Sequence, residues 1–75
     1  MSSSSLYTDD YQKLANKIKM LRIKINLTQQ ELAIRLNKTQ SYISKIETCQ
    51  LKIEAMELKK IANALNVEIK DLLWI

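Results

Sequence analysis

Residues 27–47 read LTQQELAIRLNKTQSYISKIE, and this stretch predicts two short helices joined by a tight turn. Thr28 is expected to cap the first helix, because Glu31 follows three residues later and the two form a capping-box pattern. Thr39 can cap the second helix with its hydroxyl oxygen. Asn37 falls between the helices, and asparagine tolerates the left-handed backbone conformation better than most residues. We therefore expect one unit of two helices with its turn at Asn37.

The apolar residues of this unit recur at helical spacing. Leu32, Ala33 and Leu36 make one apolar stripe on the first helix, and Ala33 is small enough for another helix to cross it closely. Ile43 and Ile46 make the inner face of the second helix. The other side chains of the second helix are predicted to face outward: Gln40, Ser41, Tyr42, Ser44 and Lys45. Short polar side chains beside basic ones on one helical face suit contacts with base edges in a DNA major groove.

Positive charge is concentrated around the same unit. Residues 11–52 carry nine Lys and Arg against two Glu, a net charge of +7, whereas residues 53–75 carry a net charge of −1. Clustered Lys and Arg attract phosphates and release counterions, which favours binding to nucleic acid. A solvated, lysine-rich surface is the alternative explanation for the same charge.

This pattern resembles the helix-turn-helix of the lambda-repressor-like (XRE) family, which includes Cro-type phage repressors and other small bacterial regulators. The likeness covers roughly residues 11–73. It rests on Gln29, Ala33, Asn37, Ile43 and Ile46, on Arg22 and Glu47, and on the segment ELKKIANALNV at residues 57–67. The resemblance implies an all-α, five-helix lambda-repressor-like DNA-binding domain with its helix-turn-helix at helices 2 and 3.

Three further helices are predicted around the central two. The first begins with a cap at Thr8 or Asp9 and ends at Asn26, the fourth covers about residues 54–65 and ends at Asn66, and the fifth covers about residues 68–74. The apolar positions assigned to the core in these helices are Leu14, Ile18, Leu21, Ile25, Leu58, Ile61, Ala62, Leu65, Leu72 and Leu73. Residues 1–8 are expected to be a disordered lead, and residues 9–75 a single helix-turn-helix domain.

The resemblance also implies roles for individual side chains. Gln40 would bond the edge of an adenine in bidentate fashion, and Gln29 would contact a phosphate and brace Gln40. Tyr42 would touch a thymine methyl or a phosphate, or would simply cover Leu36. Expected base contacts are Gln40, Ser41, Tyr42, Ser44 and Lys45. Expected contacts to the DNA backbone are Gln29, Lys24, Thr39, Lys38, Thr48, Gln50 and Lys52.

Two structural features are expected beside these contacts. Arg22 and Glu47 would form a buried or half-buried ion pair that orients the second helix of the unit. Cys49 stands where the family often has glycine, and a small, half-buried apolar role is favoured there over a redox switch or an intersubunit disulfide.

Several classes of function are excluded by composition. The chain has no His, no Gly and one Cys, and its acidic residues show no metal-ligand spacing, so we expect no enzyme activity, no metal, no cofactor and no small-molecule ligand. No apolar run is long enough to span a membrane. A single cysteine fits a reducing compartment, which indicates the cytoplasm.

The sequence therefore predicts a sequence-specific DNA-binding transcriptional regulator, a repressor that acts as a homodimer on double-stranded operator DNA with two half-sites. A phage repressor, a restriction–modification controller and an antitoxin-type autoregulator remain open. The subunit contact is expected at the C-terminal end, at Val67, Ile69, Trp74 and Ile75, because residues 74–75 follow the last core position. The alternative for Trp74 is that it folds back over the first helix. The alternative is a protein-interaction module on the same fold, with a surface formed by exposed Ile23, Ile25, Leu51 and Trp74.

Overall fold

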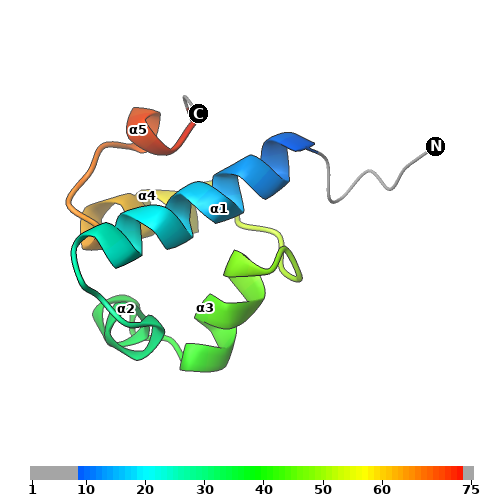
Figure 1. Cartoon of the computed structure of the whole chain (residues 1–75). Helices are drawn as coiled ribbons and strands as arrows, with labels where there is room; N and C mark the ends of the chain where they lie inside the picture. Colours follow the sequence, from blue (N-terminus) through cyan, green and yellow to red (C-terminus); the bar gives the residue numbers. More distant parts are fainter. Residues whose placement is uncertain (1–8, 74–75) are drawn as a thin grey trace.

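The computed structural model describes residues 9–73, which form five helices and contain no strand (Figure 1). The helices are α1 (Asp9–Lys24), α2 (Gln29–Leu36), α3 (Gln40–Glu47), α4 (Ala55–Ala64) and α5 (Ile69–Leu73). In Figure 1, α1 and α4 lie across the middle of the molecule, with α2 and α3 on one side and α5 on the other. The all-α, five-helix prediction is confirmed, and the predicted helix bounds differ from these by one or two residues.

The two predicted caps of the central helices are present. The backbone N–H of Glu31 donates to Thr28 Oγ1 at 3.0 Å, and the N–H of Thr28 donates to Glu31 Oε1 at 2.8 Å, so the capping box is complete. The N–H of Tyr42 donates to Thr39 Oγ1 at 3.1 Å. These bonds satisfy donors at the first turns of α2 and α3 that have no partner inside their helices.

Left-handed residues end the helices of a chain that has no glycine. Asn26 and Asn37 have φ of 58°, and Asn66 has φ of 61°. Asparagine reaches this region at lower cost than most residues, because its short side chain can form local hydrogen bonds. The predicted turns at all three asparagines are confirmed. Cys49 also has a positive φ of 61°, at the position where the resemblance implied glycine.

One core lies between the helices. It consists of Leu14, Ala15, Ile18, Leu27, Leu32, Ala33, Leu36, Ile43, Ile46, Ile61, Ala62, Leu65 and Leu72. Leu21 and Leu58 are half-buried at its edge. The stripes predicted for α2 and α3 are therefore confirmed.

Three apolar residues lie elsewhere than predicted. Ile25 is exposed, because α1 ends at Lys24 and the chain turns at Asn26, so the helical spacing no longer applies and Leu27 enters the core instead. Leu73 is 53% exposed, because it points about 100° away from buried Leu72 on α5. Leu51 is half-buried and packs against the core rather than lying on an open surface.

Candidate nucleic-acid interface

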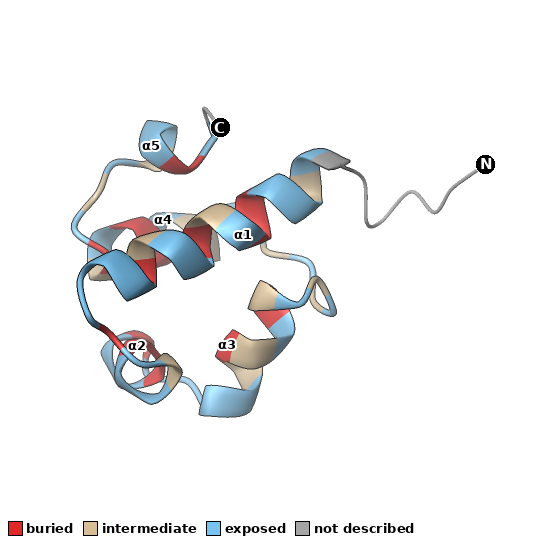
Figure 2. Ribbon diagram, in the orientation of Figure 1, coloured by how far each residue is buried: buried red, intermediate tan, exposed pale blue. Residues whose placement is uncertain are grey.

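The inner face of α3 is fixed in the core, and this decides which side chains face outward. Ile43 and Ile46 are 1% and 2% exposed. Gln40, Ser41 and Lys45 are exposed, and the exposed first turn of α3 is visible in Figure 2. Ser44 and Tyr42 are half-buried, so they are less open than predicted. The partial burial of Tyr42 results from packing, since its side chain lies against the edge of the core.

An ion pair holds α3 to α1. Arg22 Nε donates to Glu47 Oε2 at 2.7 Å, and Arg22 Nη2 donates to Glu47 Oε1 at 3.1 Å. The two side chains are 9% and 1% exposed. Arg22 Nη1 also donates to the carbonyl oxygen of Leu27 at 2.7 Å, which ties the turn after α1 to the same group. Bidentate bonds of this kind fix an orientation as well as a distance.

Two glutamines continue this pair toward the surface. Gln29 Nε2 donates to Glu47 Oε1 at 3.0 Å, and Gln40 Nε2 donates to Gln29 Oε1 at 3.2 Å. Arg22, Glu47, Gln29 and Gln40 thus form one hydrogen-bonded series from buried Arg22, near the end of α1, to the exposed start of α3, and we call it the polar chain. The bond between the glutamines has the form that the resemblance implied. The bond from Gln29 to Glu47 was not anticipated from the sequence.

Tyr42 has a polar surrounding although it is half-buried. Lys38 Nζ lies 5.0 Å from the centre of its ring, within the range of a cation–π contact. Burial raises the pKa of the Tyr42 phenol, and the carboxylates of Glu57 and Glu54 act in the same direction. Glu57 Oε2 is buried and makes no hydrogen bond in the described part of the chain. The phenol of Tyr42 is therefore harder to ionise than a phenol in water.

The chain matches a known family over this site. The model of the helix-turn-helix family aligns with residues 18–72, which contain the whole polar chain and all of α2 to α4. The chain belongs to the XRE family of helix-turn-helix proteins. The predicted resemblance is confirmed, and α3 corresponds to the recognition helix of the motif.

Solved structures with this helix-turn-helix fold include several regulators. The restriction-modification controller protein C.AhdI from Aeromonas hydrophila is 28% identical, with a TM-score of 0.81 and coverage of 87% of this chain and 98% of that one. The controller protein C.Esp1396I is 27% identical, with a TM-score of 0.82 and 91% coverage of both chains. The hypothetical transcription factor NHTF from Neisseria is 27% identical, with a TM-score of 0.80 and coverage of 97% and 86%. No curated protein matches the chain in sequence.

Family and structural neighbours agree on the general function. This helix-turn-helix protein is a DNA-binding transcriptional regulator. Among residues 9–73, no group of three or more His, Cys, Asp or Glu is arranged to hold a metal ion. None of the five helices is long and apolar enough to cross a membrane.

The side chains predicted to contact the DNA backbone are mostly open to solvent in this helix-turn-helix domain. Gln29 is half-buried. The other six are exposed: Lys24, Lys38, Thr39, Thr48, Gln50 and Lys52. Thr48 ends α3, where its hydroxyl donates to the carbonyl oxygen of Ser44 at 2.7 Å, and Gln50 Nε2 donates to Thr48 Oγ1 at 2.9 Å. The loop after α3 is thereby ordered beside the recognition helix.

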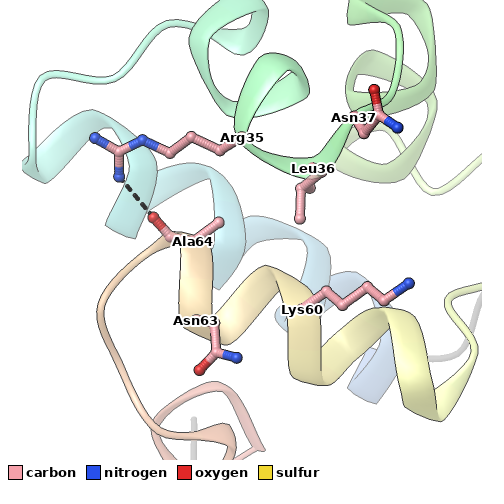
Figure 3. Close-up of a pocket in the computed structure, with 6 residues that line it drawn as sticks. All are labelled: Arg35, Leu36, Asn37, Lys60, Asn63 and Ala64. Carbon is pink, nitrogen blue, oxygen red and sulfur yellow. Dashed lines mark hydrogen bonds between the residues drawn. The ribbon is translucent and has the colours of Figure 1, made fainter.

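Two contacts that brace the motif were missed by sequence reasoning. Arg35 Nη1 donates to the carbonyl oxygen of Ala64 at 2.8 Å, so α2 caps the end of α4 (Figure 3). The N–H of Ile53 donates to the hydroxyl of Tyr11, which links the loop after α3 to α1. Both join positions far apart in sequence, so no local pattern signals them.

A groove between α2 and α4 carries two cations but does not form an anion site. It has a volume of about 440 Å³ and is lined by Arg35, Leu36, Asn37, Lys60, Asn63 and Ala64. Figure 3 shows that the side chains of Arg35 and Lys60 extend in opposite directions, and Arg35 is already bonded to Ala64. The two charges therefore do not converge on one ligand.

The residues predicted for a subunit contact fall partly within the described chain. Val67 and Ile69 are half-buried and pack against the core, while Leu73 beside them is 53% exposed. Trp74 and Ile75 lie outside the described residues. Cys49 is half-buried, with its thiol 3.9 Å from the carbonyl oxygen of Tyr11.

Proposed function

We propose that this regulator is a repressor that binds, as a homodimer, an operator of two half-sites, with α3 of each subunit in the major groove. The observation that carries the proposal is the polar chain. It ends at Gln40, an exposed amide on the first turn of α3, and it is anchored by a buried ion pair. An exposed side chain that is held in one position from behind suits the reading of a base edge.

Base contacts are assigned to the outer face of α3. Gln40, Ser41 and Lys45 are exposed and carry hydrogen-bonding groups, so we place them at the bases. Tyr42 and Ser44 are half-buried and would reach bases only along the rim of this face. For Tyr42, a contact with a phosphate or a thymine methyl fits its neutral hydroxyl and its ring equally well.

Backbone contacts are assigned to the two ends of α3 and to the start of α2. Thr39 and Lys38 precede α3, and Thr48 ends it. Lys24 adds an exposed donor at the end of α1, Gln50 and Lys52 add exposed donors on the loop after α3, and Gln29 opens α2. The net charge of +7 on residues 11–52 supports this assignment, because each neutralised phosphate releases counterions.

A homodimer follows from the size of the reading surface. One recognition helix contacts only about four base pairs, which is too short a sequence to select a site in a genome. A twofold dimer uses one self-complementary patch. The segment after residue 53 has a net charge of −1 and is not favoured by phosphates. We place the subunit contact at its end, at Val67, Ile69, Trp74 and Ile75.

Among the regulators of this family, a controller of a restriction–modification system is the class we favour. Two controller proteins match at 28% and 27% identity, and this chain spans 98% and 91% of their lengths. A regulator of this class would work in the cytoplasm, where the DNA and a reduced Cys49 are both expected.

A second candidate is a protein-binding module on the same fold. Exposed apolar residues on and after α1 favour it: Ile23 is 54% exposed and Ile25 is 41% exposed. The two functions differ in their response to salt. A DNA-binding protein binds bulk duplex at low salt, and its affinity falls steeply as salt rises. A module that binds only proteins does not bind duplex under either condition.

Fluorescence anisotropy of a labelled random-sequence duplex tests the proposal directly. We expect saturable binding at low salt and a linear fall of log affinity with log salt. Lys52→Ala should weaken binding to all duplexes alike and flatten that slope by about one unit. Lys59→Ala, at an exposed position of α4, is the control and should leave the slope unchanged. Absence of binding at low salt would leave the protein-binding module as the better account.

A further inference from the structure

The starting observation is that the carboxylate of Glu47 lies buried behind the surface that we assign to DNA. Its side chain is 1% exposed. Three N–H groups point at its carboxylate: two from Arg22, at 2.7 and 3.1 Å, and one from Gln29, at 3.0 Å. A carboxylate paired with a guanidinium accepts hydrogen bonds and cannot donate one.

Because the carboxylate of Glu47 can only accept hydrogen bonds, it fixes the orientation of the Gln29 amide. If the amide were reversed, its oxygen would face Glu47 Oε1, and two acceptors would meet in a buried position. The nitrogen of Gln29 therefore faces Glu47, and its oxygen faces α3. Gln40 Nε2 donates to that oxygen at 3.2 Å.

The amide of Gln40 is turned by the same logic. A glutamine amide has two N–H donors and one acceptor oxygen. One donor of Gln40 is used by Gln29, so one donor and the oxygen remain for DNA. In the major groove, adenine presents a donor and an acceptor side by side, whereas guanine presents two acceptors. One donor plus one acceptor matches adenine and leaves a guanine acceptor unpaired.

We propose that Glu47 is a positioning residue for base specificity: by fixing the amides of Gln29 and Gln40, it makes Gln40 select adenine over guanine. The inference rests on the proposed role of Gln40 as a base contact. A Gln40 side chain free of Gln29 could turn either way and could offer both of its N–H groups to guanine. Glu47 would thus set the base preference from inside the protein, without touching DNA.

Two variants release the amides in different ways. Glu47→Gln replaces an acceptor by a group that can either donate to Gln29 or accept from it. Gln29→Met removes the link but leaves the ion pair between Arg22 and Glu47 in place. Glu31→Gln is the matched control, because it removes the same charge from an exposed site on α2 and a glutamine there can keep the capping box.

The measurement is the ratio of affinities for adenine and guanine at the base pair read by Gln40. The probes are the tightest-binding duplex recovered from a random pool and the three duplexes that differ from it at that base pair. We expect the parent and Glu31→Gln to prefer adenine, and both Glu47→Gln and Gln29→Met to reduce the preference at least about fivefold. Overall affinity also falls in Gln29→Met, but equally on all four duplexes, so the ratio is the informative quantity.

Folding is followed by circular dichroism, and ratios are compared at a temperature where each variant is folded. If Glu47→Gln does not fold, Gln29→Met decides alone. A Gln29→Met protein that keeps the parent's preference, while Gln40→Ala loses it, would overturn the inference and leave the proposed function intact. A Gln40→Ala protein that keeps the preference would overturn the proposed base contact itself.

Discussion

Arg22 and Glu47 join the end of α1 to the end of α3 by two hydrogen bonds, and their side chains are only 9% and 1% exposed. Because both charges are buried, each one depends on the other for its partner. Removing one strands the other in a position where water cannot replace the lost bonds. The pair therefore helps to orient the recognition helix, which Ile43 and Ile46 anchor in the core.

Glu47→Ala should lower the free energy of unfolding by about 3–5 kcal/mol, as expected when one partner of a buried pair is removed. Denaturant unfolding followed by circular dichroism measures this. Lys70→Ala is the control, since Lys70 lies 3.7 Å from Glu68 in a pair whose side chains are 68% and 75% exposed, and it should change stability little. Equal, small effects of the two substitutions would mean that the pair does not hold α3.

Asn37→Ala should lower the free energy of unfolding by about 1 kcal/mol, because the φ of 58° at this position is costly for a residue with a Cβ that lacks asparagine's local hydrogen bonds. Asn37→Gly should not lower it. Asn63→Ala is the comparison, since Asn63 is an exposed residue inside α4, where alanine is the better helix former. The same loss of stability at both asparagines would argue against a backbone effect at Asn37.

Tyr42→Phe should make the protein less sensitive to alkaline pH. Burial, with Glu57 and Glu54, raises the pKa of Tyr42 in the folded state above its value in the unfolded chain. The stability gained from the neutral phenol is therefore complete below about pH 10 and is lost as pH rises through the folded pKa. As pH rises through this range, the denaturant midpoint should therefore fall more steeply for the parent than for Tyr42→Phe. A constant difference at every pH would contradict the role given to Tyr42.

Trp74→Ala should shift the monomer–dimer equilibrium toward monomer, because the subunit contact is placed at the C-terminal end. Sedimentation at micromolar concentration measures the shift. Met56→Ala is the control, since Met56 is a 71% exposed apolar residue in the first turn of α4. A Trp74→Ala protein as dimeric as the parent would remove the C-terminal contact from the account.

Local patterns in the sequence were enough to predict the helices, their caps and their turns. The capping box at Thr28 and the left-handed asparagines depend on residues within four positions of each other, so they can be predicted without a three-dimensional arrangement. Ile25 was placed wrongly for the complementary reason. Helical spacing was extended past Lys24, where the helix ends, and Leu27 could be recognised as the core residue only from the path of the turn.

The interface was predictable residue by residue but not as a connected network. The outward face of α3 follows from the buried positions of Ile43 and Ile46, which the spacing indicated. The bond from Gln29 to Glu47 joins residues 18 positions apart, and the bond from Arg35 to Ala64 joins residues 29 positions apart. Such bonds depend on how α2 packs against α3 and α4, which no local pattern specifies.

Selection of duplexes from a random pool by the full chain, followed by sequencing of the retained DNA, tests the central claim that α3 reads DNA as one half of a dimer. We expect recovered sequences with two related half-sites whose centres lie roughly 34 Å apart, one turn of duplex. We also expect one strongly preferred adenine in each half-site that loses its preference in Gln40→Ala. Recovery of unrelated sequences, with no preference that depends on Gln40, would contradict the account.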